Sequence, residues 1–157
     1  HITIKRKEDK QGMDVFISSD AKGEEIHIPV VVTKSGVTEE VYNDFYIEEG
    51  SRKAFLEVKG VTLENDGVAS FPDAPTERGI KHINELVEAV KEGYEAYILF
   101  VIQLKGINLF VPNDLTHKAF GDALRNAQKS GVKIIAVDSI IEPDSIRIDE
   151  FVPVSLC

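Results

Sequence analysis

The sequence has only one cysteine, Cys157. A single cysteine forms no internal disulfide and cannot by itself supply the thiolate ligands of an iron–sulfur cluster. This cysteine usage is typical of proteins from a reducing compartment. No histidine neighbours Cys157 in the sequence, so nothing there indicates a cysteine nucleophile.

Long apolar runs are also missing. The uninterrupted apolar stretch at residues 96–102 is much shorter than the about 20 residues that a transmembrane helix needs. The first residues alternate polar and β-branched side chains and show no signal peptide. We therefore expect a soluble, cytoplasmic protein without a membrane partner.

Basic residues are in the minority: 18 lysines and arginines stand against 27 aspartates and glutamates, which gives a net charge of −9. A chain with this charge is not expected to bind nucleic acid by general electrostatic attraction. Basic side chains do gather within residues 5–10 and 78–82, and metal ions can offset negative charge at a nuclease site. The charge makes tight DNA binding less expected without excluding it.

The 157 residues, of which 43% are hydrophobic, suffice for the core of one domain. Residues 1–43 are predicted to be β-rich, because strand-like stretches alternate there with turns that contain glycine. These stretches are residues 2–4, 14–17 and 26–32. The pattern then changes, and residues 44–157 are predicted to form a separate unit.

A β-hairpin is predicted at the start of this unit, with strands over residues 44–47 and 54–59. Side chains alternate along a strand, so Glu57 and Lys59 project to one face, and the hairpin would bring Asp44 beside them. Two carboxylates suit a hard divalent cation, and a nearby lysine can position a water molecule. The alternative is an ordinary cross-strand charge pair with a solvent-facing Asp44.

Two helices are predicted after the hairpin. Thr76 is a typical N-cap residue, apolar residues follow it at spacings of three and four, and Gly93 ends the first helix. The second helix is predicted over residues 117–130. Its inward-facing side chains are predicted to be Ala119, Phe120, Ala123, Leu124 and Ala127.

A strand over residues 96–102 is predicted to follow the first helix, and a strand over residues 133–138 is predicted to follow the second. The order strand, helix, strand predicts parallel pairing in the second half of the chain. The fold class is therefore predicted as α/β, with a mixed β-sheet flanked by helices and a β-rich N-terminal segment. The acidic residues between Asp138 and Glu150 are expected to lie on a solvated edge.

The order of these features resembles the core of the PD-(D/E)XK nuclease superfamily, although Glu-x-Lys alone is a weak signal. The surrounding sequence is more specific, and it is similar to the C-terminal domain of the sugar fermentation stimulation protein A family. The matching segments are DFYIE at 44–48, FLEVKGVTL at 55–63 and FPDAPTERGIKH at 71–82. The resemblance implies a DNA-associated protein with a nuclease-like core, usually preceded by a nucleic-acid-binding OB-type domain.

The resemblance also implies roles for individual residues. Asp44 and Glu57 would bind the metal ion, Mg²⁺ or Mn²⁺, and Lys59 would be the catalytic lysine. The alternative for Glu57 and Lys59 remains a structural charge pair.

Three further residues would contribute phosphate or DNA contacts. Arg78 and His82 lie at the start of the first helix, and Gln103 follows the next strand. Each of the three also has a plain interpretation, as a solvated or structural position.

Residues 28–47 resemble a fragment of the SUF-type iron–sulfur assembly scaffold subunits, which are β-helices. A β-helix fragment leaves open strand edges, so residues 1–43 would dock on the sheet, pair with another copy of the chain, or stay poorly ordered. This segment is either a natural fusion or an artefact.

Three functions remain open from the sequence. The chain could be a Mg²⁺- or Mn²⁺-dependent DNA phosphodiesterase, a non-catalytic DNA-binding or regulatory module, or a chimeric fragment without an independent function. The sequence does not decide whether it is an enzyme.

Overall fold

The computed structural model describes residues 2–5, 12–15, 45–49, 51–143 and 145–157. Asp44 and the strand expected over residues 26–32 lie outside the described residues. No helix in the described part is both long enough and apolar enough to cross a membrane.

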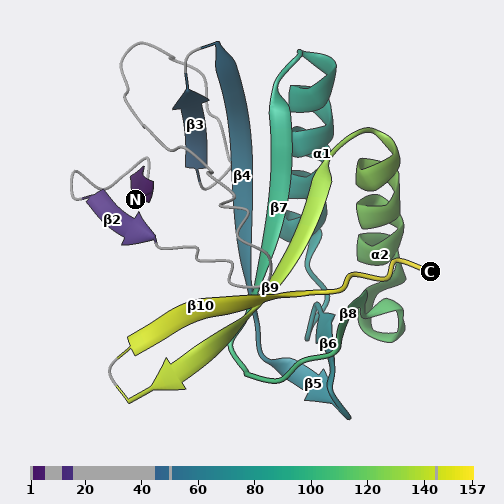
Figure 1. Cartoon of the computed structure of the whole chain (residues 1–157). Coiled ribbons are helices and arrows are strands. Elements are labelled where there is room, and N and C mark those ends of the chain that lie inside the picture. The colour runs from purple at the N-terminus through teal and green to yellow at the C-terminus, as the bar shows by residue number, and fades with distance from the viewer. Residues whose placement is uncertain (1, 6–11, 16–44, 50, 144) are drawn as a thin grey trace.

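The central element is a five-stranded mixed sheet (Figure 1). Its strands are β3 Phe45–Glu49, β4 Arg52–Val61, β7 Glu95–Ile102, β9 Lys133–Glu142 and β10 Ser145–Val152. They are ordered β10-β9-β7-β4-β3. The strands β4, β7 and β9 run parallel, whereas β3 and β10 pair antiparallel with their neighbours. Both the predicted hairpin, β3–β4, and the predicted parallel pairing are confirmed.

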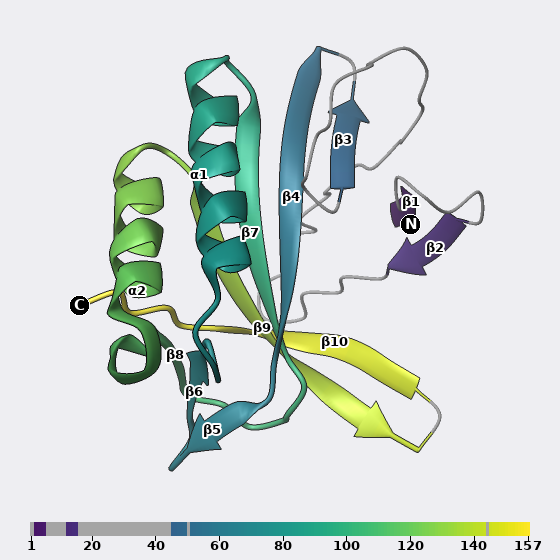
Figure 2. The same ribbon diagram turned by 180° about the vertical axis from the view of Figure 1, so that it is seen from behind.

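Two helices, α1 Glu77–Lys91 and α2 Asp114–Lys129, cover one face of this sheet (Figure 2). They do so because α1 connects β4 to β7 and α2 connects β7 to β9, so both crossovers progress in the same direction across the sheet. Thr76 caps α1 as predicted, and its Oγ1 accepts a 2.9 Å hydrogen bond from the backbone N–H of Gly79.

Helix α2 begins three residues earlier than the sequence predicted. Its N-cap is Asn113, whose side chain accepts a hydrogen bond from the backbone N–H of Thr116. His117 then interrupts the helix with φ −153° and ψ 84°. Ala119, which was expected to face inward, is exposed, while Phe120, Leu124 and Ala127 are buried as expected.

A small three-stranded sheet was not predicted. It consists of β5 Leu63–Asn65, β6 Val68–Phe71 and β8 Leu109–Pro112, in the order β5-β6-β8. The strand β6 precedes α1 and β8 precedes α2, and the two pair in parallel. This small sheet therefore joins the two crossover connections just before their helices begin.

The main core lies between the five-stranded sheet and the helices. Phe100 of β7 stacks on Phe110 of β8 with 4.2 Å between ring centroids, and Phe71 of β6 contacts the ring of Phe120 edge-on. Phe100, Phe110 and Phe120 are fully buried, and each large apolar side chain contributes about 2 kcal/mol when it leaves water. A smaller buried cluster, centred on Leu56, Leu99 and Val137, lies on the opposite face of the sheet.

The acidic stretch after residue 137 is not a solvated edge throughout. β9 continues to Glu142 and forms a hairpin with β10, and Asp138 is only 2% exposed. Its buried carboxylate accepts hydrogen bonds from the backbone N–H groups of Gly106 and Glu150. The prediction was wrong for Asp138 because these donors offset the cost of burying a charge.

The β-rich character of the N-terminal segment is visible in its described residues. There, β1 Ile2–Lys5 pairs antiparallel with β2 Gly12–Val15 in a separate two-stranded sheet.

Candidate functional site

Glu57 is a buried carboxylate on β4, an inner strand of the sheet. It lies on β4 opposite Ile98 of β7, and its residue exposure is 1%. Its neighbours on the same face of the strand, Phe55 and Val61, belong to the core beneath the helices. A carboxylate retains its charge in such a place only if donors or cations surround it.

Two side chains supply that compensation at the same oxygen. The Nζ atom of Lys59 lies 2.5 Å from Oε1 of Glu57, and Nδ1 of His82 is also hydrogen-bonded to Oε1. Lys59 projects from the same face of β4, two residues on, whereas His82 reaches the carboxylate from α1. The structure thus brings together Glu57 and Lys59, which were predicted to share one face of a strand, and adds His82, which was predicted as a phosphate contact.

Lys59 and His82 differ in their access to solvent. The side chain of Lys59 is 18% exposed, so an incoming ligand can reach it, whereas that of His82 is 7% exposed. Arg78, one turn before His82 on α1, is exposed, and its Nε donates a 3.4 Å hydrogen bond to Nε2 of His82. The structure thus connects an exposed guanidinium to the buried carboxylate through one imidazole ring.

Gln103 does not join this cluster. Its Nε2 lies 2.9 Å from the place where a Cβ at Gly60 would be. Gly60 alternates with Lys59 along β4, so this position is on the sheet face opposite the Glu57 carboxylate. The glycine allows the Gln103 amide to lie against the strand.

Asp44 lies outside the described residues, so the structure does not test its place in the site. The next residue, Phe45, pairs with Leu56, which immediately precedes Glu57.

His117 is the residue at which the second helix was predicted to begin, and in the structure it contacts the other helix. Its Nδ1 accepts a 3.2 Å hydrogen bond from the backbone N–H of Thr76, and its Nε2 lies 3.3 Å from Oε1 of Glu77. The ring thus links the start of α2 to the start of α1, the helix that carries Arg78 and His82. No signal in the sequence connects two positions 41 residues apart.

A second charged cluster lies at the β9–β10 hairpin. The carboxylates of Asp138, Asp149 and Glu150 have oxygens within 4.8 Å of one another. Lys105 lies among them, with its Nζ between 2.6 and 3.1 Å from each carboxylate. Hydrogen bonds to Asp149 and Glu150 raise the pKa of Lys105 above its usual range. The cluster is therefore an ion-pair network that already contains its own cation.

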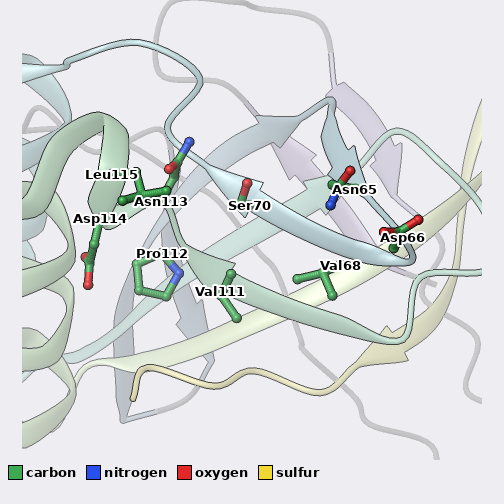
Figure 3. Close-up of a pocket in the computed structure, with 9 residues that line it drawn as sticks. All are labelled: Asn65, Asp66, Val68, Ser70, Val111, Pro112, Asn113, Asp114 and Leu115. Atoms are coloured by element: carbon green, nitrogen blue, oxygen red, sulfur yellow. The ribbon is translucent and has the colours of Figure 1, made fainter.

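A shallow hollow of about 480 Å³ lies beside the small sheet (Figure 3). It is lined by residues from the β5–β6 hairpin, β8 and the first turn of α2: Asn65, Asp66, Val68, Ser70, Val111, Pro112, Asn113, Asp114 and Leu115. Glu57, Lys59, Arg78 and His82 are not among them. The hollow is therefore separate from the buried carboxylate and its partners.

Comparison with known proteins identifies the family. The family model described as "Sugar fermentation stimulation protein RE domain" matches residues 17–145. A sugar fermentation stimulation protein homolog from Desulfitobacterium hafniense (strain Y51) is 62% identical over 113 residues, which are 72% of this chain and 50% of the relative. The chain belongs to the sugar fermentation stimulation protein family.

Other family members agree with this assignment. The homolog from Clostridium beijerinckii is 57% identical over 113 residues, again 72% of this chain and 50% of the relative. The chain thus spans about half the length of the curated relatives that it matches. The family match starts at residue 17, inside the β-rich segment predicted over residues 1–43.

A solved structure supports the fold class. SfsA of Pyrococcus furiosus, in complex with Ca²⁺, superimposes with a TM-score of 0.71 at 27% sequence identity. The superposition covers 81% of this chain and 55% of the Pyrococcus chain. The predicted α/β class, a mixed sheet with helices and a nuclease-like core, is confirmed for this member of the sugar fermentation stimulation protein family.

Proposed function

We propose that this domain is a divalent-metal-dependent DNA phosphodiesterase whose site is built around Glu57. The observation that carries the proposal is a buried carboxylate on a central strand with a partly accessible lysine at its oxygen. Burial of a charged group against hydrogen-bonding partners is common at functional sites, because low polarity strengthens every charge interaction there.

The donor chemistry at Glu57 fits Mg²⁺ or Mn²⁺. Both ions prefer carboxylate oxygens, and the Ca²⁺ bound by the Pyrococcus relative is also a hard divalent cation. A cation held here would neutralise charge on a phosphodiester and activate a water molecule. Glu57 would be one ligand of such an ion.

Asp44 would be the second ligand. This part of the proposal requires the antiparallel register of Phe45 and Leu56 to extend by one residue, so that positions 44 and 57 are paired. Directly paired residues of an antiparallel ladder project to the same face, which would bring the two carboxylates together.

The basic side chains of the cluster suit a phosphodiester substrate. Lys59 would place its ammonium group next to the reacting phosphate, where it stabilises developing negative charge. Arg78 would contact a neighbouring phosphate from the exposed start of α1. We keep Gln103 as a proposed DNA contact on the opposite face of the sheet, separate from the reacting group.

The test is cleavage of single- and double-stranded DNA by the purified chain with Mn²⁺. Glu57→Gln is the informative variant, because its amide oxygen can still accept hydrogen bonds from Lys59 and His82 while the charge is lost. We expect cleavage by the parent and a loss of about 100-fold or more in the variant, the scale of a missing charge-stabilising group.

Glu88→Ala provides a matched control. Glu88 is an exposed glutamate of α1 whose side chain pairs with Lys91, so its loss should leave cleavage unchanged. If the parent leaves both DNA forms intact, or if Glu57→Gln cleaves as well as the parent, the proposal is wrong.

A second candidate is a non-catalytic DNA-binding module with the same fold. The observation that favours it is the pairing of Glu57 with Lys59 and His82, which stabilises the carboxylate by protein groups alone. This candidate predicts salt-sensitive DNA binding that is equally strong in the parent and in Glu57→Gln, because phosphate contacts do not depend on that carboxylate. Measuring the DNA dissociation constant of both proteins at two salt concentrations separates the candidates.

A further inference from the structure

His82 and Arg78 are arranged differently from residues that only bind phosphate. His82 is 5% exposed, less than any other histidine in the described part of the chain. Its ring makes one hydrogen bond at each nitrogen, to Glu57 at Nδ1 and to Arg78 at Nε2. Because the ring is buried and both its nitrogens are hydrogen-bonded, it orients its two partners and does not contact an incoming ligand.

The partners of His82 define its tautomer. Arginine has only donors, so the bond from Nε of Arg78 requires a lone pair on Nε2 of His82. A neutral imidazole with an acceptor at Nε2 carries its hydrogen at Nδ1. That hydrogen is therefore donated to Oε1 of Glu57, and the three side chains form a directed series of donors from Arg78 to His82 to Glu57.

We propose that Arg78 and His82 are positioning residues that orient the Glu57 carboxylate for a divalent cation. This inference rests on the proposed function, because it assigns a task to two residues around the proposed metal ligand. Arg78 determines which ring nitrogen carries the hydrogen, and His82 holds Oε1 in place. Lys59 reaches the same oxygen from β4, so the orientation of the carboxylate is determined from two sides.

The physical basis is the cost of reorganising a ligand. A carboxylate that already has the orientation needed for the ion loses little conformational freedom when the ion binds. Removing the hydrogen-bonding partner of a metal ligand weakens metal binding by about 10- to 100-fold in other proteins. The proposed roles therefore predict an effect on metal affinity without any direct contact between His82 and the ion.

The first experiment measures the dissociation constant for Mn²⁺ by titration calorimetry. Compared with the parent, His82→Ala should bind about 10-fold or more weakly. His82→Asn should recover most of the affinity, because an asparagine amide N–H can replace the Nδ1 donor. Arg78→Ala should weaken binding by a smaller factor, since the ring then exchanges between tautomers.

Asn84→Ala is the matched control, because Asn84 is an exposed polar residue of the same helix. It should bind Mn²⁺ like the parent. If His82→Ala binds Mn²⁺ as tightly as the parent, the positioning role is wrong but the proposed function is not. The same holds if His82→Ala and His82→Asn weaken Mn²⁺ binding equally. A parent that binds no Mn²⁺ would overturn the proposed function and, with it, this role for the two residues.

The second experiment needs no metal ion and leaves His82 unchanged. Long-range ¹H–¹⁵N correlation spectra distinguish the two neutral tautomers of histidine, and can be recorded at about pH 8.5, where histidine is ordinarily neutral. His82 should carry its hydrogen at Nδ1 in the parent and show a mixture of tautomers in Arg78→Ala. A parent with the hydrogen at Nε2 would overturn the proposal even if Mn²⁺ binds.

Discussion

Nδ1 of His117, on α2, accepts the backbone N–H of Thr76, the N-cap residue of α1, at 3.2 Å. In the common capping box, a side chain of the same helix performs this task for the N-cap residue. Here the acceptor comes from the other helix, at the residue where α2 departs from helical geometry. The start of α1 is consequently defined by both helices together.

Replacing His117 should therefore weaken the contact between the helices. His117→Ala removes the acceptor of the Thr76 N–H, and we expect the free energy of unfolding to fall by about 1–2 kcal/mol. Urea denaturation measures the change. Lys118→Ala alters the adjacent exposed residue, whose ion pair with Asp122 is solvent-accessible, and should change stability by no more than about 0.5 kcal/mol. Equal effects of the two substitutions would contradict the capping role.

The charges around Glu95 should make stability depend on acid pH. Hydrogen bonds from Arg52 and Tyr97 lower the pKa of Glu95 from 4.5 to about 2. Because the pKa of Glu95 is lower in the folded state, its carboxylate contributes stability above pH 4.5. This contribution is lost as the pH falls toward 2. Because the Arg52 side chain is 58% exposed, solvent screening limits the contribution to about 1 kcal/mol or less.

Glu95→Gln tests this pH dependence. The variant should be less stable than the parent near neutral pH, and the difference should shrink as the pH falls below 4.5. Denaturant titrations at several pH values would measure both curves. A difference that stays constant with pH would mean that the charge of Glu95 contributes nothing.

Gly121 should be a position where alanine lowers stability despite its higher helix propensity. A Cβ there would lie 1.9 Å from Oδ1 of Asp114 and 2.9 Å from Nη1 of Arg125. The Asp114 carboxylate would have to leave its ion pair with Arg125. We expect Gly121→Ala to cost about 1 kcal/mol, although exposed glycine-to-alanine changes in helices usually gain about that amount.

A double-mutant cycle can verify the cause. In an Asp114→Ala background the obstructing carboxylate is gone, so Gly121→Ala should become neutral or stabilising. If the cost of the alanine is the same in both backgrounds, the contact with Asp114 is not its origin.

Asp138 should be one of the more sensitive polar residues of the fold. Its carboxylate accepts the backbone N–H groups of Gly106 and Glu150 at 3.2 and 2.9 Å and pairs with Lys105. Asp138→Ala leaves these donors unpaired in a buried place, and we expect a loss of about 2–4 kcal/mol. Glu150→Ala removes only a 75%-exposed partner of Lys105 and should cost less than about 1 kcal/mol by thermal or chemical denaturation. Similar losses in the two variants would argue against the special role of Asp138.

The sequence predicted the larger elements because their signals are local. Thr76 and the apolar spacing after it define α1. The start of α2 was misplaced because Asn113 caps a single turn that His117 then interrupts. The small strands were missed because each has only three or four residues, and their pairing depends on partners far along the chain.

The site was predicted to a similar extent. Alternation along one strand was enough to place Glu57 and Lys59 on a common face. The burial of His82 was not predicted, because it arises from tertiary packing that brings its ring from α1 to Glu57 on β4, 25 residues away in the sequence. Gln103 was grouped with the others because it follows a core strand, but its side chain lies on the face where Gly60 leaves space.

The parallel order of the central strands also determines when the chain can assemble this site. Ala54 pairs with Glu95 and Tyr97 with Lys133, so each pairing must close a long loop, whereas Glu142 and Ser145 of the β9–β10 hairpin are neighbours. Local hairpins form quickly and distant parallel pairs slowly. Glu57 would therefore remain hydrated until α1 closes over β4. The Glu57 carboxylate would then lose its water late in folding. A substitution of Glu57 would therefore change the unfolding rate more than the folding rate.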